Sequence, residues 1–342
     1  MGTPQAIRAG PTRPRVLLIC GSLNQTSQMH AIGRHLRDAE LRYSPFYADG
    51  LIGWLGRWGA LDFTVLGRGG EFRRMTEEYL NDHALPRDDR GLSGPYDLVV
   101  TCSDLVVQRN IRRRPIVLVQ EGMTDPPTAA YRLVRRFGLP RWVASTSTNG
   151  LSLAYRKFCV ASPGYRDLFV ANGVPAERIA VTGIPNFDNC QAYLQNDFPL
   201  RGYVLVATSD MRETFKADNR RALFDWVEIL AHGRPLVFKL HPNEARARAT
   251  REILARFPSA RVFAEGNTNH MIANCEALVT QYSSCVYVGL ALGKPCHSYL
   301  DRDELCRLLP IQNGGTSGER IARVCEEVLR GERGTVGTSR AA

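Results

Sequence analysis

Short apolar runs rich in Val, Leu and Ile alternate along the chain with segments whose apolar residues recur at every third or fourth position. The first pattern is typical of buried strands, and the second of amphipathic helices, as over Arg221–Ala231 and Ile253–Phe257. Their alternation predicts an α/β fold of βαβ units, in which helices cover both faces of parallel sheets. The expected strands are Arg15–Cys20, Leu41–Tyr47, Phe63–Leu66, Asp97–Cys102, Ile116–Gln120, Phe158–Ala161, Ile179–Thr182, Tyr203–Thr208, Leu236–Leu240, Arg261–Ala264, Ala277–Thr280 and Cys296–Tyr299.

The apolar pattern is interrupted over residues 186–202, where Asn, Asp, Pro and Gly replace the strand-like runs. A chain of 342 residues is long enough for two domains. We therefore expect two Rossmann-like αβα domains, over residues 15–190 and 191–330, with disordered tails at residues 1–14 and 331–342. Ligands of such sheets bind beyond the carboxyl ends of the strands, so the site is expected there, in a cleft between the domains.

Composition narrows the class of protein. No run of about 18 apolar residues predicts a transmembrane helix, and the first residues lack the apolar stretch of a secretory signal. The nine cysteines are scattered without any CxxC pair, which favours free thiols in a reducing cytoplasm over disulfides or a metal site. A net charge of +10 indicates anionic partners, which include phosphates, nucleic acid and acidic lipid headgroups.

Two strand ends of the C-terminal domain carry groups that suit a phosphate. Ser283 and Ser284 follow the strand Ala277–Thr280 and open an apolar helix, whose first N–H groups favour an anion. Lys239 and His241 end the strand Leu236–Leu240, where an imidazole and a cation can stabilise a leaving diphosphate. The alternative for the serines is a simple helix N-cap.

Further polar residues of this domain also follow strands. Thr208, Ser209 and Arg212 come after the strand that begins at Tyr203 and are candidates for the same phosphates, whereas Asp210 is equally suited to a helix cap. Glu265 and Thr268 follow the strand Arg261–Ala264 and suit contacts with a base or a ribose. They complete the predicted nucleotide site.

In the N-terminal domain, a turn that opens with glycine follows the strand Arg15–Cys20. It is not GxGxxG, so a dinucleotide fingerprint is absent, but its neutral side chains suit a hydroxyl-rich acceptor. The candidate acceptor-binding residues are Ser22, Asn24, Gln25, Thr26 and His30. Two carboxylates, Asp104 and Glu121, also follow strands and are candidates for a general base, with a loop cap as the alternative for each.

A segment rich in Trp and Leu occupies residues 51–63. Core packing explains such a segment most simply. A membrane-interface helix, a flap over an acceptor and a subunit contact are the alternatives.

Taken together, KLHP at residues 239–242, TQYSS at 280–284 and GLALGKP at 289–295 resemble the donor domain of GT-B glycosyltransferases. The chain is similar to the branch of polysialyltransferase-like, capsule-sugar and CDP-glycerol transferases in its His241–Pro242 and Ser283–Ser284 pairs and in Gln120–Glu121–Gly122. That branch has acidic residues at the first two positions of the last motif, so Gln120 is a departure. The resemblance implies that His241 and the serines hold the nucleotide phosphate and that Glu121 deprotonates an acceptor hydroxyl.

Residues 97–330 also resemble the non-hydrolysing UDP-N-acetylglucosamine 2-epimerases, whose acidic catalytic positions are matched by Asp104 and Glu121. Three functional segments of that family are replaced, at Pro140–Trp142, at Asp210–Glu213 and at Tyr287 or Val288. These replacements favour transfer over epimerisation.

The sequence thus predicts a GT-B-type transferase that moves a sugar or polyol phosphate from a CMP-, CDP- or UDP-linked donor to a hydroxyl of a surface polysaccharide or glycolipid, without a cofactor or an essential metal. We expect it in the cytoplasm, with peripheral contact to an anionic membrane and a homodimer left open. The alternative is an epimerase or hydrolase of nucleotide sugars. A third hypothesis is a non-catalytic protein that binds nucleotide sugars or nucleic acid, although the chain has no recognisable nucleic-acid module.

Overall fold

The computed structural model describes residues 13–58, 65, 67, 70–125, 129–209, 211–213 and 218–338. Their contacts divide the chain into two compact units. Unit 1 comprises residues 1–160, 169–180 and 317–342, and unit 2 comprises residues 161–168 and 181–316. The expected strand Phe63–Leu66 is described only at Val65, and the residue Asp210 and most of the expected N-terminal tail lie outside the described residues.

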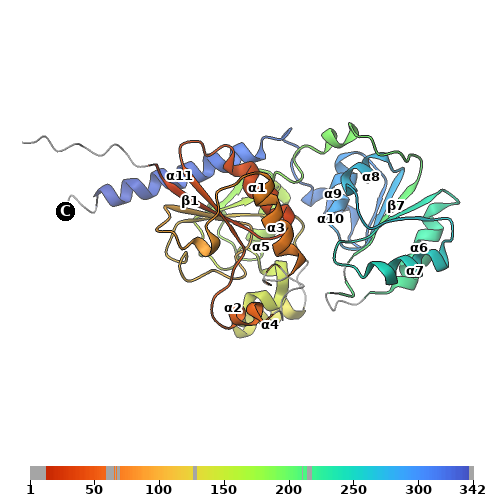
Figure 1. Cartoon of the computed structure of the whole chain (residues 1–342), viewed down its shortest axis with the longest axis horizontal. Coiled ribbons are helices and arrows are strands. Elements are labelled where there is room, and N and C mark those ends of the chain that lie inside the picture. The colour runs from red at the N-terminus through yellow and green to blue at the C-terminus, as the bar shows by residue number, and fades with distance from the viewer. Residues whose placement is uncertain are drawn as a thin grey trace, which may run out of the picture. The chain divides into compact units, whose positions relative to one another are not determined.

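Unit 1 is built on a six-stranded sheet with the order β2-β1-β3-β4-β5-β6 (Figure 1). The strands are β1 (Arg15–Cys20), β2 (Glu40–Pro45), β3 (Leu98–Thr101), β4 (Ile116–Val119), β5 (Lys157–Val160) and β6 (Ile179–Val181). The strands from β2 to β5 all pair in parallel. Pro45 is tolerated because it ends β2 at the edge of the sheet. Since β1 leads to β2 on one side and β3 lies on the other, the strand order reverses between β1 and β3.

The helices of unit 1 are α1 (Leu23–Gly33), α2 (Gly50–Arg57), α3 (Glu71–Asp82), α4 (Ala129–Phe137) and α11 (Ser317–Thr338), and α5 (Pro163–Ala171) is divided between the units. The C-terminal helix α11 packs on α1, β3 and β5, and therefore belongs to unit 1 rather than to the domain that precedes it in sequence. This helix also corrects the expected disordered tail, because residues 331–338 are helical.

Unit 2 contains a five-stranded parallel sheet with the order β11-β10-β7-β8-β9. Its strands are β7 (Val204–Ala207), β8 (Leu236–Lys239), β9 (Arg261–Phe263), β10 (Ala277–Thr280) and β11 (Cys296–His297). The helices are α6 (Arg220–Ala231), α7 (Arg246–Arg256), α8 (Thr268–Asn274), α9 (Cys285–Ala291) and α10 (Arg302–Leu308). Apolar residues of β7, β8 and β10 form a buried core with α6 and α7.

Each sheet therefore has a topological switch point, between β1 and β3 in unit 1 and between β7 and β10 in unit 2. Open α/β sheets bind ligands outside the carboxyl ends of the strands that flank such a point. The expected boundary at residue 190 differs from the observed one, because residues 181–190 are counted with unit 2. Among the described residues no helix is both long and apolar enough to cross a membrane, and the nine cysteines are free thiols.

Candidate functional site

In unit 1 the Glu121 carboxylate is held by two side chains of the turn that follows β1. The Ser22 hydroxyl donates to Glu121 Oε1 at 2.7 Å, and the Gln25 amide donates to Oε2 at 2.6 Å. Ser22 is also the N-cap of α1, since its Oγ accepts from the Gln25 backbone N–H at 3.2 Å. The structure therefore joins two expected acceptor-binding residues to the expected base, at the switch point of this sheet.

Ser22 and Gln25 are neutral donors, so they orient Glu121 without offsetting its charge. Glu121 is partly exposed, which suits a group that takes a proton from a ligand. Burial, together with the nearby Glu121 charge, holds the pKa of the Cys102 thiol well above its usual range, so Cys102 stays neutral beside it.

Gln28 and Gln120 support this turn and were not expected to do so. Gln28 is fully buried, and its Nε2 donates to the Glu121 carbonyl oxygen at 3.1 Å. Gln120, which takes the place of an acidic residue in the resemblance above, donates from Nε2 to the Gly122 carbonyl at 2.7 Å. The sequence signal for Gln120 is a polar residue at the end of an apolar run, whereas Gln28, in the polar stretch that follows Gly21, gives no such signal.

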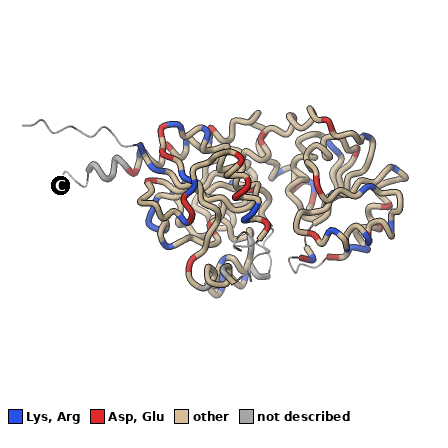
Figure 2. The backbone as a smooth tube through the Cα atoms, in the orientation of Figure 1, with Lys and Arg blue, Asp and Glu red and all other residues tan. Residues whose placement is uncertain are grey.

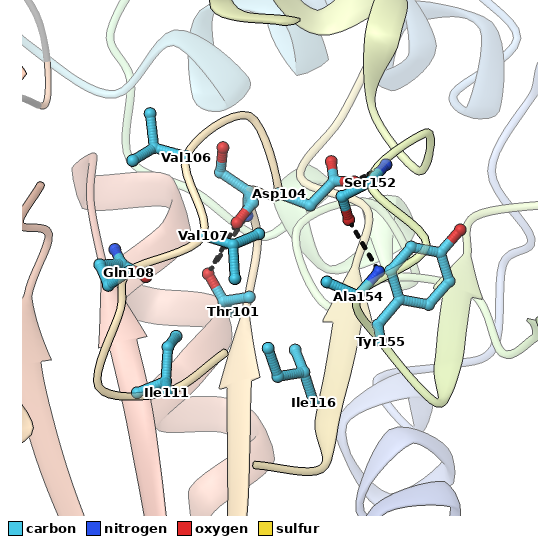
Figure 3. A pocket seen from close by; sticks show the side chains of 11 residues that line it. Thr101, Asp104, Val106, Val107, Gln108, Ile111, Ile116, Ser152, Ala154 and Tyr155 are labelled. Atoms are coloured by element: carbon cyan, nitrogen blue, oxygen red, sulfur yellow. Dashed lines mark hydrogen bonds between the residues drawn. The ribbon is translucent and has the colours of Figure 1, made fainter. Parts of the chain in front are cut away.

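Asp104 lies in a different environment from Glu121. It is 3% exposed, and its two oxygens accept from the backbone N–H groups of Gly150 and Ser152, each at 3.0 Å. Figure 3 shows it beside a cavity of about 10 Å³, which has room for about one water molecule. This geometry is that of a loop support, and we leave Asp104 out of the proposed base.

The remaining acceptor candidates of α1 are not gathered around Glu121. Thr26 is buried and donates to the Ser22 carbonyl at 2.8 Å, while Asn24 is exposed. His30 lies 3.1 Å from the Tyr79 hydroxyl through Nδ1, and burial, with His83 and Arg34 nearby, lowers its pKa. We assign these three residues no direct part in the site.

In unit 2, His241 is held in a defined tautomer at the end of β8. The Asn243 backbone N–H donates to His241 Nδ1 at 3.2 Å, so the ring proton resides on Nε2. The His241 backbone N–H donates to the Thr208 hydroxyl at 3.2 Å, which joins the turn after β8 to the end of β7. A neutral imidazole in this tautomer is a hydrogen-bond donor suited to a phosphate oxygen.

A buried network of charges lies behind this turn. The Thr208 hydroxyl donates to Glu244, Arg220 Nη2 donates to Glu244 Oε1, and Arg220 Nε lies 3.3 Å from Asp218 Oδ2. The side chains of Asp218 and Glu244 are 1% exposed, and that of Arg220 is 5% exposed. Sequence reasoning missed these three ionised residues because a charged residue on a loop or helix reads as solvent-exposed.

The network also engages other residues that were expected to bind phosphate. Ser209 donates to Gln281 Oε1 at 2.7 Å, and Gln281 donates to Asp218 at 2.8 Å. Arg212 pairs with Asp218 at 2.9 Å and with Glu252 at 3.0 Å. Thr208, Ser209 and Arg212 therefore serve to position the turns around the switch point of unit 2.

The Lys239 side chain is turned into the protein. Its Nζ donates to the carbonyls of Leu240 at 2.8 Å and Ala264 at 3.0 Å, and the residue is 6% exposed. Burial, with the Arg246 cation nearby, lowers the pKa of Lys239. Lys239 thus ties the end of β8 to the end of β9.

Ser283 and Ser284 are partly exposed after β10, on the side of the switch point opposite to β7. Ser284 is the N-cap residue of α9 but makes no side-chain cap hydrogen bond, and Ser283 Oγ accepts weakly from the Cys285 N–H at 3.4 Å. A simple capping role therefore does not account for Ser284.

The last two candidates follow β9. Glu265 is exposed and pairs with Arg246 at 3.2 Å, and Thr268 is the first residue of α8, whose cap is Asn267. No group of three or more His, Cys, Asp or Glu side chains that could hold a metal occurs among the described residues.

Searches of protein-family models and of curated proteins find no match to this chain. Solved structures do match. The UDP-GlcNAc 2-epimerase from Neisseria meningitidis bound to UDP-GlcNAc has a TM-score of 0.56 and 12% identity, over 92% of this chain and 100% of that one. The S. aureus MnaA-UDP structure has a TM-score of 0.57 and 13% identity, over 91% and 87% of the chains.

The wall teichoic acid polymerase TagF, soaked with CDPG, has a TM-score of 0.52 and 13% identity, over 94% of this chain and 90% of that one. Identities this low establish a shared fold and no more. The two parallel-sheet α/β units thus confirm the predicted fold class, and the chain has the GT-B-like fold of the epimerases and of TagF.

Proposed function

We propose that this chain is a glycosyltransferase that moves a sugar or polyol phosphate from a nucleotide-activated donor to a hydroxyl acceptor of a surface polysaccharide or glycolipid. The observation that carries the proposal is the Glu121 carboxylate, oriented by the neutral donors Ser22 and Gln25 at the switch point of unit 1. A carboxylate held in this way suits a general base for an acceptor hydroxyl. Solved structures of the same fold contain UDP-GlcNAc, UDP and CDPG.

In the proposed reaction, Glu121 takes the acceptor hydroxyl proton while the acceptor oxygen forms a bond to the transferred group. The bond from that group to the nucleotide phosphate oxygen breaks, and the electron pair leaves with the phosphate. His241, through Nε2–H, and the hydroxyls of Ser283 and Ser284 stabilise the negative charge that develops there. The proposal assigns these roles to the protein's own groups and requires no metal.

The second candidate is an epimerase or hydrolase of nucleotide sugars, which the fold shared with the 2-epimerases favours. Three features of this chain speak for transfer instead. Tyr287 and Val288, at the position of one replaced functional segment of that family, are each 1% exposed, so their side chains are not accessible to a ligand. In the second replaced segment, Glu213 accepts hydrogen bonds from the Ala245 backbone N–H and the Arg248 side chain. In the third, Trp142 is an exposed tryptophan. Turnover of the nucleotide sugar without an acceptor would favour the epimerase or hydrolase.

A thermal-shift panel of CMP, CDP, UDP, GDP and ADP tests the nucleotide site, because a ligand that binds only the folded state raises the melting temperature. We expect a shift with a pyrimidine nucleotide, retained in the presence of a chelator. In His241→Ala the apparent Kd is expected to rise by about tenfold or more, the effect of losing a charge-assisted hydrogen bond.

His232→Gly is the control for that variant, since His232 is exposed at the end of α6 with φ 46°, a conformation that glycine adopts readily. It should leave the shift unchanged. No shift with any nucleotide would contradict the proposal and favour the third hypothesis, a binding protein, for which salt-sensitive binding to RNA or DNA is the next measurement.

Gly21→Ala tests whether Gln25 positions the base. A Cβ at Gly21 would collide with Gln25 Oε1, so Gln25 would have to turn away and its hydrogen bond to Glu121 would be lost. A hydrogen bond to a charged group contributes about 1.5–3 kcal/mol, so turnover should fall by about 10- to 150-fold. Nucleotide-induced thermal shifts should be unchanged, because unit 2 is not altered. Gly331→Ala, whose Cβ meets nothing within 4 Å, should have no effect on turnover. Equal turnover rates for Gly21→Ala and Gly331→Ala would show that Gln25 does not position Glu121.

A further inference from the structure

A surface of unit 1 presents large apolar side chains to solvent. It is formed by the end of α4 and the start of the 3-10 segment Arg141–Thr148, and we call it the α4 face. Its members are Leu133 (49% exposed), Phe137 (67%), Leu139 (42%), Trp142 (48%) and Val143 (45%). Such side chains occur singly on most surfaces, but a group of five within 11 residues marks an interaction site.

The opposite side of the same segment is folded against unit 1. Tyr131, Val134 and Ala144 are buried together and pack with Leu151. Arg135 Nη1 donates to the Asn172 carbonyl at 2.6 Å and to the Tyr131 hydroxyl at 3.1 Å, which fixes α4 in place. The α4 face is therefore the outer side of an anchored amphipathic segment.

The charge along the segment that carries the α4 face has one sign. Arg132 and Arg136 are exposed on α4, and no Asp or Glu occurs in the sequence between Asp125 and Asp167. By contrast, acidic and basic residues are interspersed along α6 and α7 of unit 2 (Figure 2), where Arg256 pairs with Asp225 and Glu228. The α4 face thus combines Phe, Trp and Leu with two exposed arginines, for which no ion pair is found among the described residues.

A second pair of exposed aromatic residues lies on α2. Trp54 is 46% exposed and Trp58 is 74% exposed, with ring centroids 5.8 Å apart. This corrects the expectation that the Trp-rich segment packs in the core, as far as its described residues go. Figure 1 shows α2 and α4 at the same end of unit 1.

We propose that the α4 face docks on an anionic phospholipid membrane, with its apolar side chains among the acyl chains and Arg132 and Arg136 against the headgroups. Basic amphipathic helices with Trp, Phe and Leu on one side bind membrane surfaces in this way. A second copy of the chain fits less well, because symmetric pairing of this face would bring like-charged arginines together. Nucleic acid would use the arginines but leave Leu133, Leu139 and Val143 exposed.

Flotation of the full-length protein with phospholipid vesicles tests the proposal and needs neither nucleotide nor turnover, so its failure would leave the proposed function untouched. We expect binding to phosphatidylcholine vesicles that contain phosphatidylglycerol, weaker binding in high salt, and little binding to phosphatidylcholine alone. Phe137→Ser and Trp142→Ser should each reduce vesicle affinity by about tenfold. The double variant Arg132→Gln with Arg136→Gln should reduce it by about fivefold for each charge.

Matched variants in unit 2 distinguish docking through the α4 face from nonspecific adsorption of the protein to vesicles. Ile229→Ser with Leu254→Ser removes two exposed apolar side chains, and Arg221→Gln with Arg251→Gln removes two exposed charges. Both double variants should bind vesicles as the wild type does. The α4 face is not the docking site if the unit 2 variants lose as much vesicle binding as the α4-face variants. The same conclusion holds if the α4-face variants bind vesicles as the wild type does. Concentration-dependent self-association lost only in the α4-face variants, without vesicle binding, would overturn the proposal in favour of a second copy of the chain.

Tryptophan fluorescence measures insertion of the α4 face into the bilayer independently of flotation. Trp142 fluorescence should be quenched by lipids with brominated acyl chains, and Trp142→Phe, which keeps an aromatic side chain, should retain flotation while losing that part of the quenching. Unchanged quenching in Trp142→Phe would show that Trp142 does not enter the bilayer and would overturn the proposed orientation.

Discussion

Replacing Glu121 with Gln is expected to lower transfer to the acceptor by about 100- to 10,000-fold, the usual contribution of a general base. The amide has nearly the shape of the carboxylate and can still bond to Ser22 and Gln25 after a rotation of the Gln25 amide, so the turn should stay folded. The measurement is release of nucleotide from the activated donor identified by thermal shift, with and without a polysaccharide or glycolipid acceptor. The nucleotide-induced shift itself should be unchanged.

Asp104→Asn is the informative comparison for that variant. Asp104 accepts from two backbone N–H groups, one at each carboxylate oxygen. In asparagine the side-chain NH2 group would replace one of these oxygens and face a backbone N–H, so that hydrogen bond would be lost. We expect a lower melting temperature for Asp104→Asn, with turnover per folded molecule close to the wild-type value. Full activity in Glu121→Gln, or loss of turnover in a well-folded Asp104→Asn, would contradict the assignment of the base.

Replacing Glu244 with Gln is expected to destabilise unit 2 by about 3–5 kcal/mol, because it leaves the buried Arg220 guanidinium without one of its two partners. Differential scanning calorimetry should show that unit 2 unfolds at a lower temperature than in the wild type. Nucleotide binding should weaken as well, since Glu244 accepts from Thr208, which accepts from the His241 N–H.

Glu265→Gln is the matched control, because Glu265 is 83% exposed in its pair with Arg246 and an exposed pair contributes about 0–1 kcal/mol. Adding Arg220→Met to Glu244→Gln should restore part of the lost stability, since an unpaired buried charge costs more than an absent one. Equal melting temperatures for Glu244→Gln and Glu265→Gln would show that the buried network does not stabilise unit 2.

The strands could be predicted because parallel strands covered on both faces consist of short, nearly continuous apolar runs. Eleven of the expected strands are present, each with bounds within about two residues of the prediction, and the twelfth, Phe63–Leu66, is described only at Val65. The end of α11 could not be predicted in this way. Residues 331–338 contain glycines and lack an apolar stripe, yet they continue a helix that begins at Ser317 and packs on unit 1.

The site was predictable in part. A strand that ends in Glu121 and a turn that opens with Gly21 predict polar groups at one edge of a sheet, and the structure joins Glu121 to Ser22 and Gln25 there. The same reasoning predicted that Lys239 and Thr208 contact the nucleotide phosphates. A polar residue that ends a strand can instead turn inward, and the structure shows Lys239 bonded to carbonyls and Thr208 bonded to Glu244.

The sequence by itself determined the class of fold, the number of sheets and the strand ends at which polar groups gather, because these depend on local apolar periodicity and on where it stops. The tertiary structure decided which of those groups meet. Glu121 and Ser22 are 99 residues apart in the chain, and Thr208 and Glu244 are 36 apart. Strand order and helix packing fix such contacts, and neither is contained in a pattern of neighbouring residues.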